Sequence, residues 1–414
     1  MLTLEENELL TGVGPDTPAG QLLRRYWFPV AVSQDLAEQT TKFIRLLGED
    51  LVLFKDLSGR VGLLADHCSH RGASLLYGRV EERGISCAYH GWLYDCEGNI
   101  LETPPERNDA IMNSVKHTAY PVKQFIGMYW AYLGPAPAPA IPNLDVWVRK
   151  DGKRHVFVHP PMDCNWVQAQ ENSLDPTHAL ILHQDAAHRK ARPVDSTRGF
   201  IDDMTGFEFP LTDYGIMKDE IFGNGYVEQH PVMFPNVLRV HNSTEIRVPI
   251  DRTRTRIFEV YFDLSEDGSI NEDDELELPV EFGDPYKEPA DKLHPFTRAK
   301  MNTVPQQDQA MWESQGLVSN RPAEHLSYSD RGVSLFRKLM FENIVKVQEG
   351  EDPLAVFRDP DHPMIETGLT RAVQHRKPLG INTPTYEVAT GKLIAAGTHD
   401  NVNERWRKSS PQTR

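Results

Sequence analysis

The sequence is poor in the features that define several large classes of protein. Four cysteines in 414 residues are too few for a disulfide scaffold, and no uninterrupted apolar run reaches the ~18 residues of a membrane-spanning helix. Basic charge is also scarce, because 44 Lys and Arg stand against 60 Asp and Glu, a formal net charge of −16. Nucleic acid is therefore a poor partner, since its phosphates would be repelled.

The first residues, MLTLEENELL, place acidic side chains before any apolar run and lack the basic stretch that opens a signal peptide. We therefore expect a cytoplasmic protein that is not bound to a membrane. In that reducing compartment, cysteine thiols stay free to bind metals.

The length and the changes of pattern predict two domains. Residues 1–26 are typical of a helical segment, expected to pack on the second domain, and residues 27–134 alternate short apolar stretches with turn signals, which predicts an all-β domain. Residues 135–143 are rich in Pro and Ala and predict a stiff linker. Residues 144–414 mix helical and strand patterns, so the fold class expected for the whole chain is α+β.

Within the second domain, CNWVQAQENSLDPTHALILHQ predicts helix with a break at Asp175-Pro176. Residues 237–262 predict paired strands around the polar turn DRTRT, whereas the acidic stretch 264–292 predicts a loop or an excursion. Helices are expected in MNTVPQQDQAMWESQG and SDRGVSLFRKLMFENIVKVQEG, and a polar tail is expected over 375–414.

Two short motifs in the β domain each offer one thiolate and one imidazole. Cys68 and His70 are separated by one residue, sixteen residues follow, and then Cys87 and His90 are separated by two. A structural zinc site would accept two Cys and two His. In such sites, however, one segment usually supplies the two cysteines and another the two histidines. One Cys and one His from each loop fit a two-iron cluster with both cysteines on one iron and both histidines on the other.

Residues around the two motifs bear on the potential of such a cluster. Clusters of this kind in high-potential respiratory proteins have an extra cysteine in each ligand loop and a Ser after the second His-Gly. In this chain those positions hold Ala73 in the first loop, Ala88 or Tyr89 in the second, and Trp92 in place of the Ser. Fewer hydrogen bonds to the sulfurs predict a lower potential, suited to feeding an oxygen-activating metal. The remaining thiols, Cys96 and Cys164, are expected to be small buried hydrophobes.

A second constellation follows the linker. His178 and His183 are five residues apart, about 500° of helix, so they converge on one metal only if the helix ends, kinks or carries a π-bulge. Asp175, one turn earlier, is placed to accept a ring N–H and orient it. Two imidazoles and one carboxylate bind ferrous iron with open positions for O₂. Asp308 is the candidate carboxylate, and spacing alone leaves three alternatives, Glu313, Asp330 and Glu342.

With both motifs in hand, the chain resembles the oxygenase component of Rieske non-haem iron ring-hydroxylating or O-demethylating oxygenases, in particular the phthalate dioxygenase-like branch. The resemblance runs through EENELLTGVGPDTPAGQLLRRYWFPV, RLLGEDLVLFKD, HCSHRGASLLYG, CAYHGWLYD, NWVQAQENSLDPTHALILH and QDQAMWES. It implies a Rieske β-sandwich, then a catalytic domain with a curved antiparallel sheet covered by helices. It also implies a homotrimer or hexamer.

The resemblance further implies the roles of single residues. Cys68, His70, Cys87 and His90 would hold a [2Fe–2S] Rieske cluster, and three residues would hold mononuclear Fe(II), namely His178, His183 and Asp308. Asp175 would connect a cluster histidine of one subunit to an iron histidine of its neighbour. Electrons from NAD(P)H would arrive through a separate reductase of the flavin or ferredoxin type, and O₂ would be the oxidant.

The substrate expected from this branch is an aromatic carboxylate of the phthalate or benzoate type, with O-demethylation of a methoxylated aromatic acid as the alternative. Arginine matches a carboxylate bidentately, and strand alternation predicts that Arg239, His241 and Arg247 share a face. Asn172 and Gln168 are expected near the iron pocket. Two hypotheses from other functional classes also stay open. The protein could be a Rieske electron carrier, or a zinc-stabilised binding protein without catalysis.

Overall fold

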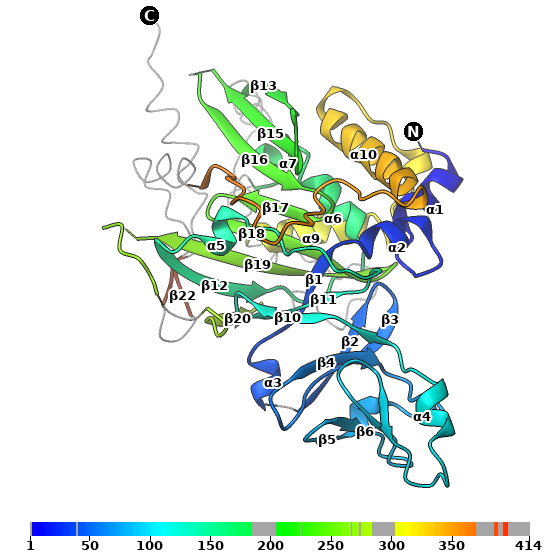
Figure 1. Ribbon diagram of the computed structural model, residues 1–414. Helices are drawn as coiled ribbons and strands as arrows, with labels where there is room; N and C mark the ends of the chain where they lie inside the picture. The colour runs from blue at the N-terminus through cyan, green and yellow to red at the C-terminus, as the bar shows by residue number, and fades with distance from the viewer. Residues whose placement is uncertain are drawn as a thin grey trace, which may run out of the picture.

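The computed structural model describes residues 2–369 except 39, 184–203, 224, 266, 273–274 and 284–302, together with two short strands near the C-terminus, β21 (Thr385–Glu387) and β22 (Lys392–Ala395). Most of the tail expected over 375–414 lies outside the described residues. Figure 1 shows two parts, a smaller β-rich unit and a larger unit built on one long sheet with helices against it. None of the described helices is long and apolar enough to cross a membrane.

The chain begins on the larger unit. Helix α1 (Leu4–Thr11) opens with a capping box between Thr3 and Glu6, and α2 (Pro18–Leu23) opens on the Thr17 side chain with a proline in its first turn. Both helices contact the long helix α10 (Arg331–Gln348). Leu10 and Leu22 are fully buried there, so the first residues belong to the core of the larger unit.

The β-rich unit consists of three small antiparallel sheets. Their orders are β2-β3-β4-β9, β5-β6-β7-β8 and β1-β11-β10. The strands are β1 (Trp27–Val32), β2 (Thr41–Leu46), β3 (Glu49–Lys55), β4 (Val61–Ala65), β5 (Arg79–Glu81), β6 (Gly84–Ser86), β7 (Leu93–Tyr94), β8 (Ile100–Glu102), β9 (Ala119–Tyr120), β10 (Val122–Phe125) and β11 (Met128–Tyr132). The short helices α3 (Asp35–Glu38), η1 (Leu75–Tyr77) and α4 (Ala110–Ser114) connect them.

The Pro/Ala segment that follows is fastened by hydrogen bonds. Trp27 Nε1 donates to the carbonyl of Pro139 at 2.8 Å, and Arg358 donates to that of Pro137 at 2.6 Å. One continuous buried core runs from α1 and β1 to the strands and helices of the second unit. The two units are therefore packed together, and the linker lies along their junction.

The second unit is built on a nine-stranded sheet in the order β13-β15-β16-β17-β18-β19-β12-β20, with β14 beside β15. Its strands are β12 (Gly152–Val158), β13 (Met204–Glu208), β14 (Leu211–Thr212), β15 (Gly215–Phe222), β16 (Val227–Met233), β17 (Val237–Val240), β18 (Ser243–Asp251), β19 (Arg254–Leu264) and β20 (Val280–Phe282). The α+β class is confirmed, as is the hairpin predicted around DRTRT, which joins β18 to β19.

One expectation about the sheet is corrected. The stretch 264–292 is not simply a loop, because β20 lies within it and pairs with β12 in parallel. The fully buried guanidinium of Arg154, on β12, also pairs with Glu275 in this stretch. A three-residue strand and one buried ion pair leave no apolar period in the sequence, so pattern reading could not detect them.

Helices lie on both faces of the sheet. On one face, α6 (Trp166–Asn172) contacts β18, α9 (Val304–Ser314) and α10. On the other, α5 (Asp145–Val148) contacts β19, and Trp147 Nε1 donates to Thr244 Oγ1 at 2.7 Å. The predicted break at Asp175-Pro176 separates α6 from α7 (His178–Leu182), and η3 (Arg321–Ala323) and η4 (Tyr328–Asp330) precede α10.

Candidate metal centres and active site

The two Cys/His loops of the β-rich unit have the same backbone construction. In the first, Cys68 N–H donates to Ala73 O at 2.9 Å and Gly72 N–H donates back to Cys68 O at 2.8 Å. In the second, Cys87 N–H donates to Trp92 O at 2.8 Å and Gly91 N–H to Cys87 O at 2.9 Å. Both glycines have left-handed φ angles, +72° and +74°, which favour residues without a Cβ. The loops therefore present their side chains as a matched pair.

The side chains of these loops converge with the sulfurs inside and the imidazoles outside. Cys68 and Cys87 are each only 3% exposed, whereas His70 and His90 are half-buried with ring centroids 4.5 Å apart. Burial raises the pKa of Cys87, and the adjacent Cys68 adds to that shift. The buried Nδ1 of His70 has no hydrogen-bond partner among the described residues. Two buried thiols next to two half-buried imidazoles fit a cluster with one iron on each pair.

Two aromatic side chains surround this group. Trp92 stacks on the His70 ring with centroids 4.7 Å apart and planes 5° apart. The hydroxyl of Tyr94 lies 3.0 Å from Cys68 Sγ, a contact that the sequence analysis missed. The loops thus lack the respiratory-type serine but have one hydroxyl at the sulfur of a candidate ligand. The other two thiols lie elsewhere, Cys164 fully buried and Cys96 half-buried near Asp56.

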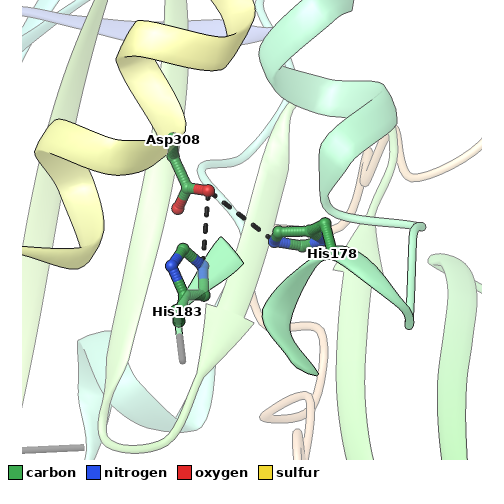
Figure 2. A group of neighbouring side chains, drawn as sticks. All are labelled: His178, His183 and Asp308. Atoms are coloured by element: carbon green, nitrogen blue, oxygen red, sulfur yellow. Dashed lines mark ion pairs between the residues drawn. The ribbon is translucent and has the colours of Figure 1, made fainter. Parts of the chain in front are cut away.

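Two histidines and one aspartate meet between α7 and α9 (Figure 2). The Oδ1 atom of Asp308 lies 3.3 Å from His183 Nε2 and 3.7 Å from His178 Nε2. Asp308 is 9% exposed, and its Oδ1 meets no hydrogen-bond donor in good geometry among the described residues. A buried carboxylate oxygen without a donor between two imidazole nitrogens fits a metal ion.

Helix α7 ends where the two histidines require it. His178 is its first residue and Leu182 its last, so His183 is the C-cap, with φ −87° and ψ 2°. The rings consequently approach to a centroid distance of 5.3 Å at 83°, instead of pointing to different sides of a continuing helix. Of the three ways of convergence left open by the sequence, an end, a kink or a π-bulge, the structure has the end of the helix.

The outer nitrogens of both imidazoles are held by hydrogen bonds. His183 Nδ1 donates to Gln307 Oε1 at 2.8 Å, and His178 Nδ1 donates to the main-chain oxygen of Asp175 at 2.9 Å. The Asp175 carboxylate was expected to accept the ring N–H, and this is corrected. It lies 3.7 Å from that nitrogen and instead accepts from the N–H and hydroxyl of Thr177, both at 2.7 Å. The turn after Asp175 places the Thr177 N–H and hydroxyl next to the Asp175 carboxylate. These donors bind it in place of the His178 ring.

The three alternative acids are occupied elsewhere. Glu313 accepts from Asp163 N–H at 3.1 Å, Asp330 forms a capping box with Ser327, and Glu342 lies on the exposed side of α10 near Lys338. Of the four candidate carboxylates, Asp308 is the one that the structure brings to the two histidines.

The sheet face that is turned towards His178, His183 and Asp308 carries paired charges. Arg247 donates to Glu245 at 2.6 Å, and Glu259, directly across from Glu245, contacts His159 Nε2 at 3.1 Å. Burial alone would raise the pKa of Asp308, but the charges of His183, His178 and Arg247 hold that pKa below its usual value. Arg247 therefore acts on the candidate metal site through its field.

The residues expected to bind substrate are only partly brought together. Arg239 lies opposite Thr244 in the strand register, so its side chain is on the face away from Arg247, where it donates to Thr367 O at 2.6 Å. His241 adopts a left-handed φ of +54°, which breaks the alternation and turns its ring towards Glu228, 3.6 Å away, on the Arg247 face. The shared face predicted for all three residues is therefore wrong for Arg239.

The two α6 residues that were expected near the iron pocket, Gln168 and Asn172, also have different surroundings. Gln168 is 2% exposed and bonds to the carbonyls of Trp312 and Gly316 and to Ser319 N–H, so it fastens the segment after α9. Asn172 is half-buried at the C-terminal end of α6, and its carbonyl accepts from Asp175 N–H at 3.1 Å. Gln307 was missed altogether. Its one signal in the sequence was its position next to Asp308.

Comparison with known proteins follows this geometry. The Rieske [2Fe-2S] domain family matches residues 26–125, and a family described as LigXa C-terminal domain like matches residues 290–373. The 5,5'-dehydrodivanillate O-demethylase oxygenase subunit of a Sphingobium species is 36% identical over 371 residues, 87% of this chain and 84% of that protein. The phthalate 4,5-dioxygenase oxygenase subunit of Pseudomonas putida is 31% identical over 86% of this chain and 89% of its own.

A solved complex between the oxygenase and ferredoxin of carbazole 1,9a-dioxygenase has the same fold, with a TM-score of 0.58 at 21% identity, over 81% of this chain and 93% of that one. Fold and sites together define a Rieske non-haem iron oxygenase. More narrowly, the chain belongs to the oxygenase subunits of the phthalate dioxygenase-like branch. A [2Fe–2S] cluster, a mononuclear iron and O₂ are the cofactors of this class, so an electron carrier or a zinc-stabilised binding protein is excluded.

Proposed function

We propose that the protein hydroxylates an aromatic acid at a mononuclear iron held by His178, His183 and Asp308. The observation that carries this proposal is the buried Oδ1 of Asp308, which lies 3.3 Å and 3.7 Å from the two imidazole nitrogens. Iron(II) in such a site supplies O₂ activation, and three protein ligands leave positions for O₂. The surrounding residues fix the ligands, through Gln307 on His183 and the Asp175 carbonyl on His178.

Electrons would enter through the Rieske cluster, held by Cys68, His70, Cys87 and His90. The two half-buried imidazoles lie on the outer side of the ligand group and the two buried sulfurs on its inner side, so an electron donor approaches closest at the histidines. We propose a flavin or ferredoxin type reductase that passes electrons from NAD(P)H, in the cytoplasm. The related carbazole oxygenase, whose solved complex includes a ferredoxin, supports a partner of this kind.

The oligomer would be a homotrimer or a hexamer in which the cluster of one subunit serves the iron of the next. Within one chain, β5 and β6, which flank the ligand loops, lie at the end of the β-rich unit far from α7 (Figure 1). Transfer between subunits removes that separation. Asp175, which contacts His178 through its carbonyl and lies at the break before α7, would connect the two centres.

An aromatic acid is supported by the names of the relatives and by Arg247 on the iron-facing side of the sheet. His241 and Asn172 would complete the substrate contacts. A second candidate reaction, O-demethylation of a methoxylated aromatic acid at the same iron, is favoured by the O-demethylase relative at 36% identity. Both reactions need the same iron and the same electron supply.

The test is turnover of a panel of benzoate, phthalate and methoxybenzoates with a matched reductase and NADH. We expect a diol, a phenol or a demethylated acid that depends on the iron and is absent with Asp308→Ala. We also expect Arg247→Gln to raise KM for the accepted acid but not for its neutral amide, since the guanidinium reads the carboxylate. Turnover of neutral arenes alone, or an equal KM effect on acid and amide, contradicts the proposal.

A further inference from the structure

A buried lysine of the large sheet has no part in the metal centres or in the substrate contacts described above. Lys218 lies on β15 and is 4% exposed, and its Nζ atom is 3.1 Å from Oε1 of Glu220. The two residues are two positions apart on one strand, so their side chains share a face of the sheet. Glu220 is buried as well, at 6% exposure. The two side chains therefore form a buried ion pair.

Stability alone does not account for this ion pair. Taking two charges out of water is costly, and a well-packed apolar pair of similar volume is often equally stable or more stable. Lys218 has a further contact that an apolar side chain could not make, because its Nζ donates to the carbonyl oxygen of Asp175 at 3.4 Å. That oxygen lies in the break between α6 and α7, three residues before His178.

The Asp175 carbonyl connects Lys218 to the candidate iron site. The same oxygen accepts from His178 Nδ1 at 2.9 Å. It thus lies between an ammonium group and the imidazole whose other nitrogen, Nε2, is 3.7 Å from Oδ1 of Asp308. The charge of Lys218 reaches that ring. Burial lowers the pKa of His178 and Lys218 lowers it further, whereas the charges of Asp308 and Asp175 oppose the shift.

Two effects of this lysine on a metal held by His178 have the same sign. A positive charge in a poorly solvated site favours the metal state of lower charge. The ammonium group also draws electron density from the Asp175 oxygen, which makes that oxygen a weaker acceptor for His178 and the imidazole a poorer electron donor to the metal. Both effects favour ferrous over ferric iron. Glu220 counters the first effect, because its charge partly cancels that of Lys218.

We propose that Lys218 is a positioning residue of the iron site, which raises the reduction potential of iron at His178 through its charge and through the Asp175 carbonyl, while Glu220 limits the rise. The inference rests on the iron ligands of the proposed function. A higher potential at the iron favours the uptake of an electron from the Rieske cluster. The buried pair on β15 would thereby act on electron delivery although neither residue is a metal ligand.

The experiment is a mediated redox titration of the complete, iron-loaded protein without substrate or O₂, in which EPR follows the high-spin ferric form of the mononuclear iron. Lys218→Met removes the charge and keeps an unbranched side chain. We expect it to lower the ferrous-to-ferric ratio at a fixed potential by about tenfold, which is 59 mV for a one-electron couple. Lys218→Arg keeps the charge and should restore most of the loss. Glu220→Gln removes the counter-charge and should shift the potential upwards.

Opposite shifts in the two single variants separate a charge effect from a structural one, because a loosened break would shift both variants in the same direction. Where a single variant leaves its partner charge buried and does not fold, Lys218→Met combined with Glu220→Gln removes both charges. Its potential should still lie below that of the wild type, because Lys218 is the residue of the pair that contacts the Asp175 carbonyl. Lys338→Met, at an exposed lysine of α10, is the matched control and should leave the potential in place.

A wild-type potential in Lys218→Met or in the double variant, or a downward shift in Glu220→Gln, would overturn the proposal. The potential of the Rieske cluster, which has its own EPR signal when reduced, should stay constant in every variant, and an equal shift there would also contradict a local effect on the iron. Iron content of Asp308→Ala tests the proposed ligand set separately. Full iron retention in that variant contradicts the proposed function, whereas iron loss there together with an unshifted potential in Lys218→Met contradicts this inference alone.

Discussion

The ring of His183 donates a hydrogen bond from Nδ1 to Oε1 of Gln307 at 2.8 Å, and Gln307 is the residue immediately before Asp308. Helix α9 thus supplies both a candidate iron ligand and the group that orients another. We expect Gln307→Leu to weaken iron binding by about 10–100-fold, the usual effect of removing such a partner. Iron content after dialysis against a mild chelator measures this.

Gln307→Glu is the control for that substitution, because it keeps an acceptor at the same position and should retain iron. The absorption of the Rieske cluster reports in both variants that the other metal centre is intact. Equal iron retention in Gln307→Leu and the wild type would show that the hydrogen bond does not support the site.

The contact between Tyr94 and Cys68 predicts a change in the cluster potential. A hydroxyl that donates to a ligand sulfur stabilises the reduced, more negative cluster, so Tyr94→Phe should lower the potential. A net hydrogen bond of about 0.5–1.5 kcal/mol corresponds to roughly 20–65 mV for a one-electron couple. Protein-film voltammetry measures the shift. Tyr77→Phe, at an exposed tyrosine in the same unit, should leave the potential in place.

Asp175→Asn tests the connection between the two metal centres. Asn can still accept from Thr177 and cap the turn, so both metals should stay bound and the fold should not change. We expect electron transfer from the reduced cluster to the iron to slow by orders of magnitude, because the negative charge at the break is gone. Stopped-flow spectra of cluster reoxidation with substrate and O₂ measure the rate. A wild-type rate in this variant contradicts the role.

Glu171 predicts a pH-dependent stability. Its carboxylate is buried and bonded to Arg321 at 2.8 Å and to Arg337 at 2.6 Å. Burial alone would raise the pKa of Glu171, but the two arginines hold it below its usual value. The ionised pair therefore stabilises the fold above the unfolded pKa of about 4.3, and this contribution is lost as the pH falls through the folded value.

We expect Glu171→Gln to lower the free energy of unfolding at pH 7 by about 3–5 kcal/mol, because it leaves buried Arg321 without its charge partner. The gap between variant and wild type should narrow below about pH 4.3 as the wild-type carboxyl is protonated. Urea unfolding followed by tryptophan fluorescence at several pH values measures both effects. Glu342→Gln, at an exposed acid of α10, should change little.

Much of this molecule could be predicted from local sequence. The Cys/His loops can be predicted from their spacing, because each loop places its candidate ligands and its left-handed glycine within a few residues. The break before α7, the β18–β19 hairpin and helices α9 and α10 also follow from turn chemistry and period.

What could not be predicted depends on contacts between distant segments or on single backbone angles. Gln307 meets His183 across 124 positions of sequence, and β20 pairs with β12 across a stretch of similar length. Alternation put Arg239 and Arg247 on one face because it assumed extended backbone throughout. One residue with positive φ, His241, ends that regularity, and no sequence period reports it.

The position of α1 and α2 on α10 has a consequence for how the cluster is carried. The chain starts in the catalytic unit, leaves it along β1 to build the Rieske unit, and returns along β11, which pairs with β1. The Rieske unit is therefore an insertion held by two adjoining strands, and β1 also contacts β18 of the large sheet. Rotation about this double attachment would have to break a ladder of hydrogen bonds. We therefore expect a variant that shortens or frays β1 to slow electron delivery from the Rieske unit without changing any metal ligand.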